Sequence, residues 1–330
     1  MTPSPQALDL PQLLATIAEP MEAVNQWLAQ QYQPESPRLR PLVEHVRQFK
    51  GKQVRAAQVL LIAQGCGKLS DQHIPLAGVV EMIHAATLVH DDLLDGAKER
   101  RGLDCTHVMW GAHASVLLGD WIYAKAFQRS TEFSDQTCAN ELARATAAVC
   151  LGEISQNLSC KDFELSEAEY VDQIDGKTAA LFEAGSRLAA FYGGGNKEVQ
   201  DACARHGLLA GRAFQMMDDL LDLVGDQASA KKSLGTDWAN GKMTLPLIRL
   251  REMLPADARQ RLADGFGSGE PRSALLQGEF AEPLEVALTS CRLEISNAPE
   301  EACQVLKVLP VAEARDCLVD LTRFLGSRNR

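Results

Sequence analysis

Long apolar runs with helical spacing dominate the chain, and strand-like alternation is hard to find. Residues 77–95 are apolar almost all round, which is typical of a helix buried on every side, and Gly96 follows as a stop. The same pattern predicts long helices over residues 114–129, 140–157, 177–192 and 201–224. A helix-rich, buried interior is therefore expected.

Proline positions support this pattern. All fourteen prolines lie at or before Pro75 or at or after Pro246, so none forces a break in the helices between them. The chain is predicted to be all-α and to form a single domain over residues 1–330, in which residues 1–41 supply an N-terminal helix and a connector. Further helices are predicted over 10–31, 245–254, 283–296 and 311–325, and loops over 193–196 and 265–271.

The composition is that of a globular protein, and the charge argues against nucleic acid as a partner. Hydrophobic residues make up 46% of the chain, and the net charge is -11. A general nucleic-acid binder would show a basic face. An acidic surface still allows a local basic pocket for an anionic substrate.

Cysteine usage and the absence of apolar segments bear on location. Nine cysteines, an odd number without a Cys-x-x-Cys pair or zinc-like spacing, predict no disulfide framework and a reducing compartment. Cys66, Cys150, Cys203 and Cys303 are expected as small core residues. The N-terminus lacks the pattern of a secretory signal, and no uncharged apolar run approaches membrane-spanning length. We therefore predict a cytoplasmic protein with no integral membrane segment.

The most distinctive pattern is the pentapeptide Asp-Asp-Leu-Leu-Asp, which occurs at residues 91–95 and again at 218–222. Each copy ends an apolar run and places its carboxylates within about one helical turn. Like charges four residues apart cost roughly 0.2–0.5 kcal/mol, and carboxylates near a helix C-terminus oppose the helix dipole by about 0.3–1 kcal/mol each. A chain that does this twice is expected to hold something cationic between the clusters.

A single copy would more often be a solvated acidic helix end. Two copies on highly apolar helices favour function, because buried Asp residues are rare unless partnered. Closely spaced carboxylates suit Mg²⁺, a hard cation that shares its coordination with substrate phosphates. The candidate metal ligands are Asp91, Asp92, Asp95, Asp218, Asp219 and Asp222.

Basic residues recur beside both acidic motifs, and they are candidates for binding a diphosphate. Arginine offers planar paired donors to phosphate, and lysine offers a point charge. Singly, each would more often be a solvated surface side chain. The recurring residues are Lys52, Arg55, Arg100, Arg101, Lys231, Lys232 and Lys242.

Seven segments appear in an order that is specific to one family: residues 51–55, 84–95, 100–102, 119–120, 176–178, 214–222 and 241–246. On these segments the chain resembles the trans-isoprenyl diphosphate synthases of the polyprenyl synthetase family. The resemblance implies an all-α isoprenoid synthase fold with helices around a central cavity, a Mg²⁺-dependent prenyltransferase activity, and a homodimer. The expected reaction joins isopentenyl diphosphate to an allylic diphosphate such as farnesyl diphosphate.

The resemblance also implies roles for single residues. The catalytic set would be Asp91, Asp92, Asp95, Asp218, Lys177 and Gln215. The allylic diphosphate would contact Arg100, Lys177 and Lys242, and Thr178 and Gln215 would line the reacting centre. Isopentenyl diphosphate would contact Lys52, Arg55, His84 and Arg101, and Lys232 is a further substrate-binding candidate. Without its spacing of seven before Asp91, which the family shares, His84 would be expected to be a satisfied core histidine.

One segment departs from the family pattern. Family members usually carry Gly-Gly-Lys-Arg-x-Arg-Pro near the start, and here Lys50, Gln53 and Ala56 replace the first Gly, the first Arg and the Pro. Lys52 and Arg55 keep the matching positions. We expect weaker binding of isopentenyl diphosphate but an active enzyme.

Residues just before the first motif bear on product length. In the family, bulky aromatics four or five residues before the first Asp close the product tunnel of short-chain enzymes. Here those positions are Thr87 and Ala86, and one turn deeper are Ile83 and Met82. Small residues favour a long, octaprenyl-like product. In the alternative, Ala86 packs against a neighbouring helix and another residue closes the tunnel.

Three rival functions remain open. A short-chain farnesyl or geranylgeranyl diphosphate synthase would carry the same motifs. A terpene cyclase shares the helical fold, but its second metal motif usually differs from a second Asp-rich pentapeptide. A regulatory, non-catalytic subunit tends to lose an Asp motif, and this chain keeps both.

Overall fold

The computed structural model describes residues 10–34, 36–49, 51–225, 234–269 and 271–327. Among these, helices account for all regular structure except one antiparallel hairpin, β1 (Glu99–Arg100) and β2 (Leu103–Asp104). The all-α prediction is confirmed. That residues 1–330 form one domain stays a prediction. Lys50, Lys231 and Lys232 lie outside the described residues.

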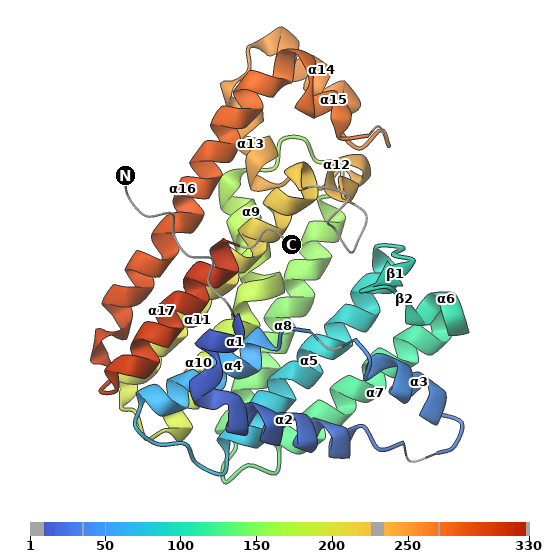
Figure 1. The fold of residues 1–330 in the computed structure, drawn as a ribbon. Coiled ribbons are helices and arrows are strands. Elements are labelled where there is room, and N and C mark those ends of the chain that lie inside the picture. The colour runs from blue at the N-terminus through green and yellow to red at the C-terminus, as the bar shows by residue number, and fades with distance from the viewer. Residues whose placement is uncertain (1–9, 35, 50, 226–233, 270, 328–330) are drawn as a thin grey trace.

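Two long helices, α5 (His73–Leu94) and α11 (Lys197–Val224), run through the bundle, and the other helices pack around them (Figure 1). The helices in contact with them include α2 (Ala18–Gln31), α4 (Val54–Gly65), α7 (Ala112–Ser130), α10 (Ala180–Tyr192), α16 (Ala281–Val305) and α17 (Ala312–Gly326).

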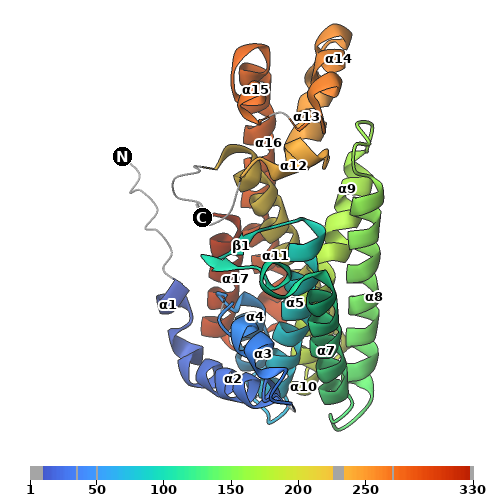
Figure 2. The same cartoon turned by 90° about the vertical axis from the view of Figure 1, so that its right-hand side faces the viewer.

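The remaining elements cover the ends and sides of the bundle. Figures 1 and 2 both show α14 and α15 at one end, beyond α12, and α2 at the opposite end. These elements are α1 (Leu10–Leu13), η1 (Ala15–Ile17), α3 (Arg40–Val46), α6 (Thr106–Trp110), α8 (Thr137–Leu158), α9 (Glu167–Ile174), η2 (Asp175–Ala179), α12 (Thr236–Asn240), α13 (Leu245–Met253), α14 (Ala256–Gly265), α15 (Ser273–Leu276), η3 (Gly278–Phe280) and η4 (Leu306–Val308).

The apolar core consists of two clusters of buried side chains. The larger contains side chains of α4, α5, α7, α10 and α17, and the smaller contains side chains of α9, α13 and α16. Helix α11 belongs to both, with Ala210 in the first cluster and Met216 in the second. This shared helix fixes the second acidic motif relative to both parts of the core.

Most predicted helices exist, but several boundaries were wrong and some elements were missed. The helix predicted over residues 10–31 is wrong as a single element, since the structure divides it into α1, η1 and α2. The pattern did not predict α4, α9, α14 or the β1–β2 hairpin. Helix α4 is buried along nearly its whole length, so it shows no amphipathic stripe. Helix α16 continues through Pro299 to Val305, although proline normally ends a helix. Pro299 is buried, which indicates that packing outweighs the lost hydrogen bond.

The cysteines form no disulfide, and all nine lie in the part of the chain that the structure describes. The expectation of core positions holds for Cys203, which is buried, but it is wrong for Cys150 and Cys303. These two lie on the outward faces of α8 and α16 and are exposed. Among the described residues, no helix combines the length and the apolar character needed to cross a membrane.

Candidate functional site

The two acidic motifs lie at the same end of the bundle, where α5 and α11 finish (Figures 1 and 2). A direct contact supports this placement. Lys242, which follows α12, places its Nζ 2.8 Å from Oδ1 of Asp95 at the end of α5. The segment after the second motif therefore reaches across to the first.

Asp92 of the first motif is buried and pairs with Arg100. The Arg100 Nε donates to both carboxylate oxygens at 2.8 Å, and a terminal nitrogen lies 2.6 Å from Oδ1. Arg100 ends β1, and the two-residue turn Arg101–Gly102 has positive φ at both positions. Such turns suit the twist of a hairpin, and this one turns the chain back directly after Arg100.

Lys177 is the centre of the charge arrangement. Its Nζ donates to Glu153 Oε1 at 2.8 Å and to Gln156 Oε1 at 2.9 Å, both on α8. Burial lowers the pKa of Lys177, but Glu153 and Asp91 raise it more, and the net shift is upward. Sequence reasoning missed Glu153 and Gln156, because they lie on a helix without an acidic motif.

Asp91 sits in the same charge group. Burial raises the pKa of its carboxyl to about 7, with Lys177 opposing this shift and Glu153 and Asp95 adding to it. Burial also lowers the pKa of Lys242, whereas Asp95 and Asp237 raise it to a net upward shift. Carboxylates and ammonium groups thus stabilise one another in a partly dry space.

Asp219 of the second motif is hydrogen-bonded within the protein. Its Oδ2 accepts from the hydroxyl of Tyr170 at 2.7 Å, and its Oδ1 accepts from Nε2 of Gln215 at 2.8 Å. Gln215 in turn accepts from the hydroxyl of Thr178 at 2.6 Å. Burial raises the pKa of Asp219 to about 6, and the bonds from Tyr170 and Gln215 oppose that rise. Tyr170 was missed by the sequence reasoning.

Asp222 is in the last turn of α11, and its carboxylate contacts the first residues of α12. Its carboxylate accepts from the hydroxyl of Thr236 at 3.1 Å and from the backbone N–H of Asp237 at 3.0 Å. It therefore caps that short helix. The carboxylates of Asp219 and Asp222 thus accept from neutral donors, whereas those of Asp92 and Asp95 pair with cations. Asp218 is half-buried on α11.

Three of the four residues predicted to contact isopentenyl diphosphate, Arg55, His84 and Arg101, form a second, basic group beside the first. Arg55 is buried, and its guanidinium carbon lies 4.4 Å from the ring centre of Phe182. The pKa of His84 is lowered by burial and by the positive charges of Arg55, Arg100 and Arg101. Neutral His84 thus lies among three cations, while the Lys52 Nζ lies 4.9 Å from the ring centre of Phe324.

Two residues of this basic region have strained backbones. Gln53, which stands in place of the family's first Arg, has φ 47°, and Arg101 has φ 55°. Left-handed conformations at residues other than glycine occur often at ligand sites. A guanidinium nitrogen of Arg101 also donates to the carbonyl of Phe49, just before this segment.

The predicted chain-length residues lie in the interior. Met82, Ile83 and Ala86 are fully buried on α5. Thr87 is partly buried, and its hydroxyl donates to the carbonyl of His84 at 2.8 Å. The side chains that would extend or close a tunnel are thus inside the bundle.

The donor set suits a hard divalent cation in its chemistry, though not as a closed cage. No group of three or more His, Cys, Asp or Glu side chains among the described residues is placed to hold a metal ion by itself. Mg²⁺ keeps waters and commonly shares carboxylates with substrate phosphates, so an open set of carboxylates fits it.

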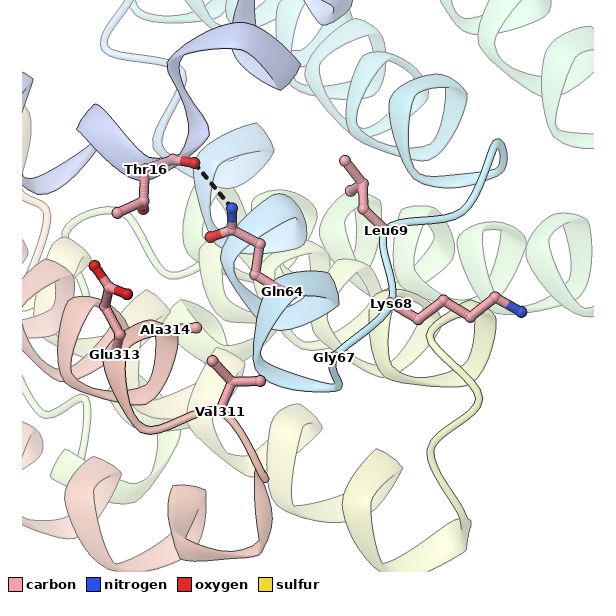
Figure 3. Close-up of a pocket in the computed structure, with 8 residues that line it drawn as sticks. All are labelled: Thr16, Gln64, Gly67, Lys68, Leu69, Val311, Glu313 and Ala314. Carbon is pink, nitrogen blue, oxygen red and sulfur yellow. Dashed lines mark hydrogen bonds between the residues drawn. The ribbon is translucent and has the colours of Figure 1, made fainter.

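Of two hollows in the surface of the described residues, only one is bordered by predicted site residues. A hollow of about 240 Å³ is bordered by Asp95, Glu153, Gln156 and Lys242, together with apolar residues of α8. A second, of about 330 Å³, lies between the end of α4 and the start of α17, and Figure 3 shows it with Lys68 and Glu313 at its edge. No predicted site residue lines this second hollow.

The fold and the paired acidic helix ends define an α-helical enzyme of isoprenoid synthesis. The family model for polyprenyl synthetases matches residues 36–277, and the chain belongs to the polyprenyl synthetase family. It is accordingly a prenyltransferase.

Individual relatives agree over the full length. The chain is 30% identical to the octaprenyl diphosphate synthase of Escherichia coli, covering 98% of this chain and 100% of that protein. The crystal structure of a polyprenyl synthase from Caulobacter crescentus, complexed with calcium and isoprenyl diphosphate, superposes with a TM-score of 0.88 at 32% identity, covering 99% and 100% of the two chains. A geranylgeranyl pyrophosphate synthetase from Pyrococcus horikoshii gives 0.86 at 30% identity, covering 96% and 98%.

Tyr170→Phe should destabilise the protein in a pH-dependent way. It removes a hydroxyl donor from a buried carboxylate, and a hydrogen bond to a charged group contributes about 1.5–3 kcal/mol. Because the pKa of Asp219 is about 6, the carboxylate is charged at pH 8 and protonated at pH 5. Urea unfolding should therefore show a larger loss at pH 8 than at pH 5. An equal loss at both pH values would contradict the assignment.

Proposed function

We propose that the protein uses Mg²⁺ to condense isopentenyl diphosphate with an allylic diphosphate, giving an all-trans polyprenyl diphosphate. The observation that carries this proposal is a set of three ion pairs. Arg100, Lys177 and Lys242, the cations assigned to the allylic diphosphate, pair with Asp92, Glu153 and Asp95. Each pair thus holds one cation that a diphosphate would need and one carboxylate.

Binding would exchange one set of pairs for another. Metal ions would take the carboxylates of Asp91, Asp92, Asp95 and Asp218, while the diphosphate oxygens would take the released cations. When bound, Mg²⁺ would stabilise the negative charge that develops on the departing diphosphate. For Arg100 and Lys242 the exchange leaves both members of each ion pair with a new partner of opposite charge, which limits its cost.

The cationic side chains and the apolar interior would together favour ionisation of the allylic substrate and the attack that follows. Stabilisation of the leaving diphosphate by Arg100, Lys177 and Lys242 favours ionisation of the allylic carbon–oxygen bond. The double bond of isopentenyl diphosphate then attacks the allylic cation, and a proton is lost, with released diphosphate as the acceptor. Thr178 and Gln215, which hydrogen-bond to each other, would line this reacting centre. The apolar interior keeps water from the cation.

The neighbouring basic group would hold the second substrate. Lys52, Arg55 and Arg101 would contact isopentenyl diphosphate, and neutral His84 would offer a ring N–H. Lys232 remains a candidate outside the described residues. Location in the cytoplasm also stays a prediction, supported by the nine free cysteines.

Asp91→Ala and Asp218→Ala should each lower turnover by about a hundredfold or more, because each would remove a ligand that acts on the developing charge. The assay uses Mg²⁺, labelled isopentenyl diphosphate and farnesyl diphosphate, with circular dichroism to show retained helicity. Asp201→Ala is the control, since Asp201 pairs with Arg187 and Lys197 at the other end of α11. Retained activity in either variant would refute the shared-metal site.

The same assay separates the rival functions. No incorporation by the natural sequence would favour a regulatory subunit, and a cyclic hydrocarbon would favour a terpene cyclase. A product of four or fewer isoprene units would show a short-chain synthase. We propose a long, octaprenyl-like product, because neither Ala86, which is buried, nor Thr87, which is partly buried, has an aromatic side chain that would close a tunnel.

Ala86→Phe should shorten the product. Ala86 is fully buried on α5, so a phenyl ring there would occupy space that a growing chain would need. Sizing the dephosphorylated products by mass spectrometry checks this expectation. Ala86→Gly, which adds no volume, is the control. An unchanged length in Ala86→Phe would mean that the tunnel ends elsewhere.

We also propose a homodimer formed through α7 and α8. The outward face of α8 is almost free of charge and exposes Leu151, Ile154 and Leu158, and Leu117 of α7 is 67% exposed. An apolar surface of this kind is typical of a protein interface. Leu151 and Leu117 would lie within it.

Leu151→Glu should weaken the dimer at least about tenfold, because a charge would be buried without a partner. Sedimentation velocity measures the effect. Leu293→Glu is the matched control, since Leu293 is a similarly exposed leucine on α16. A monomeric natural protein, or equal effects of both substitutions, would refute this interface.

A further inference from the structure

Two predicted site residues lie on an unusual turn. The π-helical turn η2 (Asp175–Ala179) interrupts the helix that α9 and α10 would otherwise form, and it carries Lys177 and Thr178. Such turns are rare, and they are frequent at functional sites. An irregular turn persists only where its surroundings hold it in place.

Neighbouring helices press on this turn from two sides. A Cβ added at Gly152 of α8 would lie 2.4 Å from the backbone nitrogen of Lys177. A Cβ added at Gly211 of α11 would lie 2.5 Å from the Cα of Ala179. The two glycines therefore let the backbones of α8 and α11 approach η2 directly. Close packing limits the position of the turn but does not by itself fix its register along α11.

A paired ion contact lies beside the second of these glycines. The Arg212 guanidinium donates from Nε to Oδ1 and from a terminal nitrogen to Oδ2 of Asp175, both at 2.5 Å. Three residues further along the same face of α11, Gln215 accepts from Thr178. Side chains of α11 thus contact the first and the fourth residue of η2, Asp175 and Thr178.

We propose that Asp175 and Arg212 are positioning residues for prenyl transfer. Their bidentate ion pair sets the register of η2 against α11. It thereby sets the positions of the Lys177 ammonium and the Thr178 hydroxyl in the site. Neither side chain is part of the diphosphate site. This inference rests on the proposed function, in which Lys177 contacts the allylic diphosphate.

The competing view is an ordinary surface ion pair. The Arg212 and Asp175 side chains are 29% and 26% exposed, and exposed pairs usually matter little. Helix α11 offers a second ion pair for comparison. Arg205 donates from two nitrogens to one oxygen of Glu301, and these side chains are more exposed, at 41% and 47%. Arg205→Gln is therefore the control for Arg212→Gln.

The kinetic test compares Arg212→Gln, Asp175→Asn, their double variant and Arg205→Gln. Displacement of a catalytic group by about 1 Å costs roughly a hundredfold in rate, so kcat should fall about 10- to 100-fold in each of the first two. KM for isopentenyl diphosphate and the melting temperature should match those of Arg205→Gln. The double variant should be no slower than the singles, since the pair acts as one unit. Asp175→Glu should recover most of the rate.

An unchanged kcat in Arg212→Gln, or an equal loss in Arg205→Gln, would overturn the proposal. Amide hydrogen exchange of residues 175–179 provides a second measurement that does not need activity. Exchange there should increase in Arg212→Gln and Asp175→Asn but not in Arg205→Gln, and unchanged exchange would also overturn it. If the natural protein makes no prenyl product, the proposed function fails, while the exchange result still decides whether the pair holds the turn.

Discussion

The arrangement of this site depends on one electrostatic constraint: carboxylates in a partly dry interior need cationic or hydrogen-bonding partners. Asp92 is only 2% exposed, and Arg100 from the β1–β2 hairpin balances it. In a second pair the cation is the more buried member: the Lys242 side chain is 16% exposed, and it contacts the 45% exposed Asp95, 147 residues earlier in the chain. Because each partner comes from a different segment, satisfying the carboxylates also fixes how those segments pack. In the proposed function, the same pairs hold the cations in place for an anionic substrate.

The two identical pentapeptides differ in the partners of their carboxylates. The first meets cations that an arriving diphosphate could take over. In the second, Asp219 is held by Tyr170 and Gln215, and Asp222 caps α12. Two of its three carboxylates therefore stabilise the scaffold around the site. The sequence made all six carboxylates candidate metal ligands, and the tertiary contacts separate them.

The sequence predicted what is local and missed what is not. Long helices and both motifs follow from spacing along one segment, which a single sequence contains. Helix α4 was missed because burial on every side removes the amphipathic stripe. Glu153 and Tyr170 were missed for another reason: each becomes a site residue only through a partner on a different helix. Their own neighbours in the sequence carry no signal of that contact.

The two departures from the family pattern at Gln53 and Ala56 lie at the start of α4, and the structure gives the second a physical reason. Where members usually have proline, the backbone N–H of Ala56 donates to Oε1 of Glu81 at 3.0 Å, a bond that proline cannot make. The carboxylate thus lies at the N-terminus of α4, where the helix dipole favours negative charge. Arg55 opposes the rise that burial causes in the pKa of Glu81, so the two groups attract each other. The substitution that removes the proline therefore adds a hydrogen bond that anchors the helix carrying Arg55, beside the position where Gln53 has replaced an arginine.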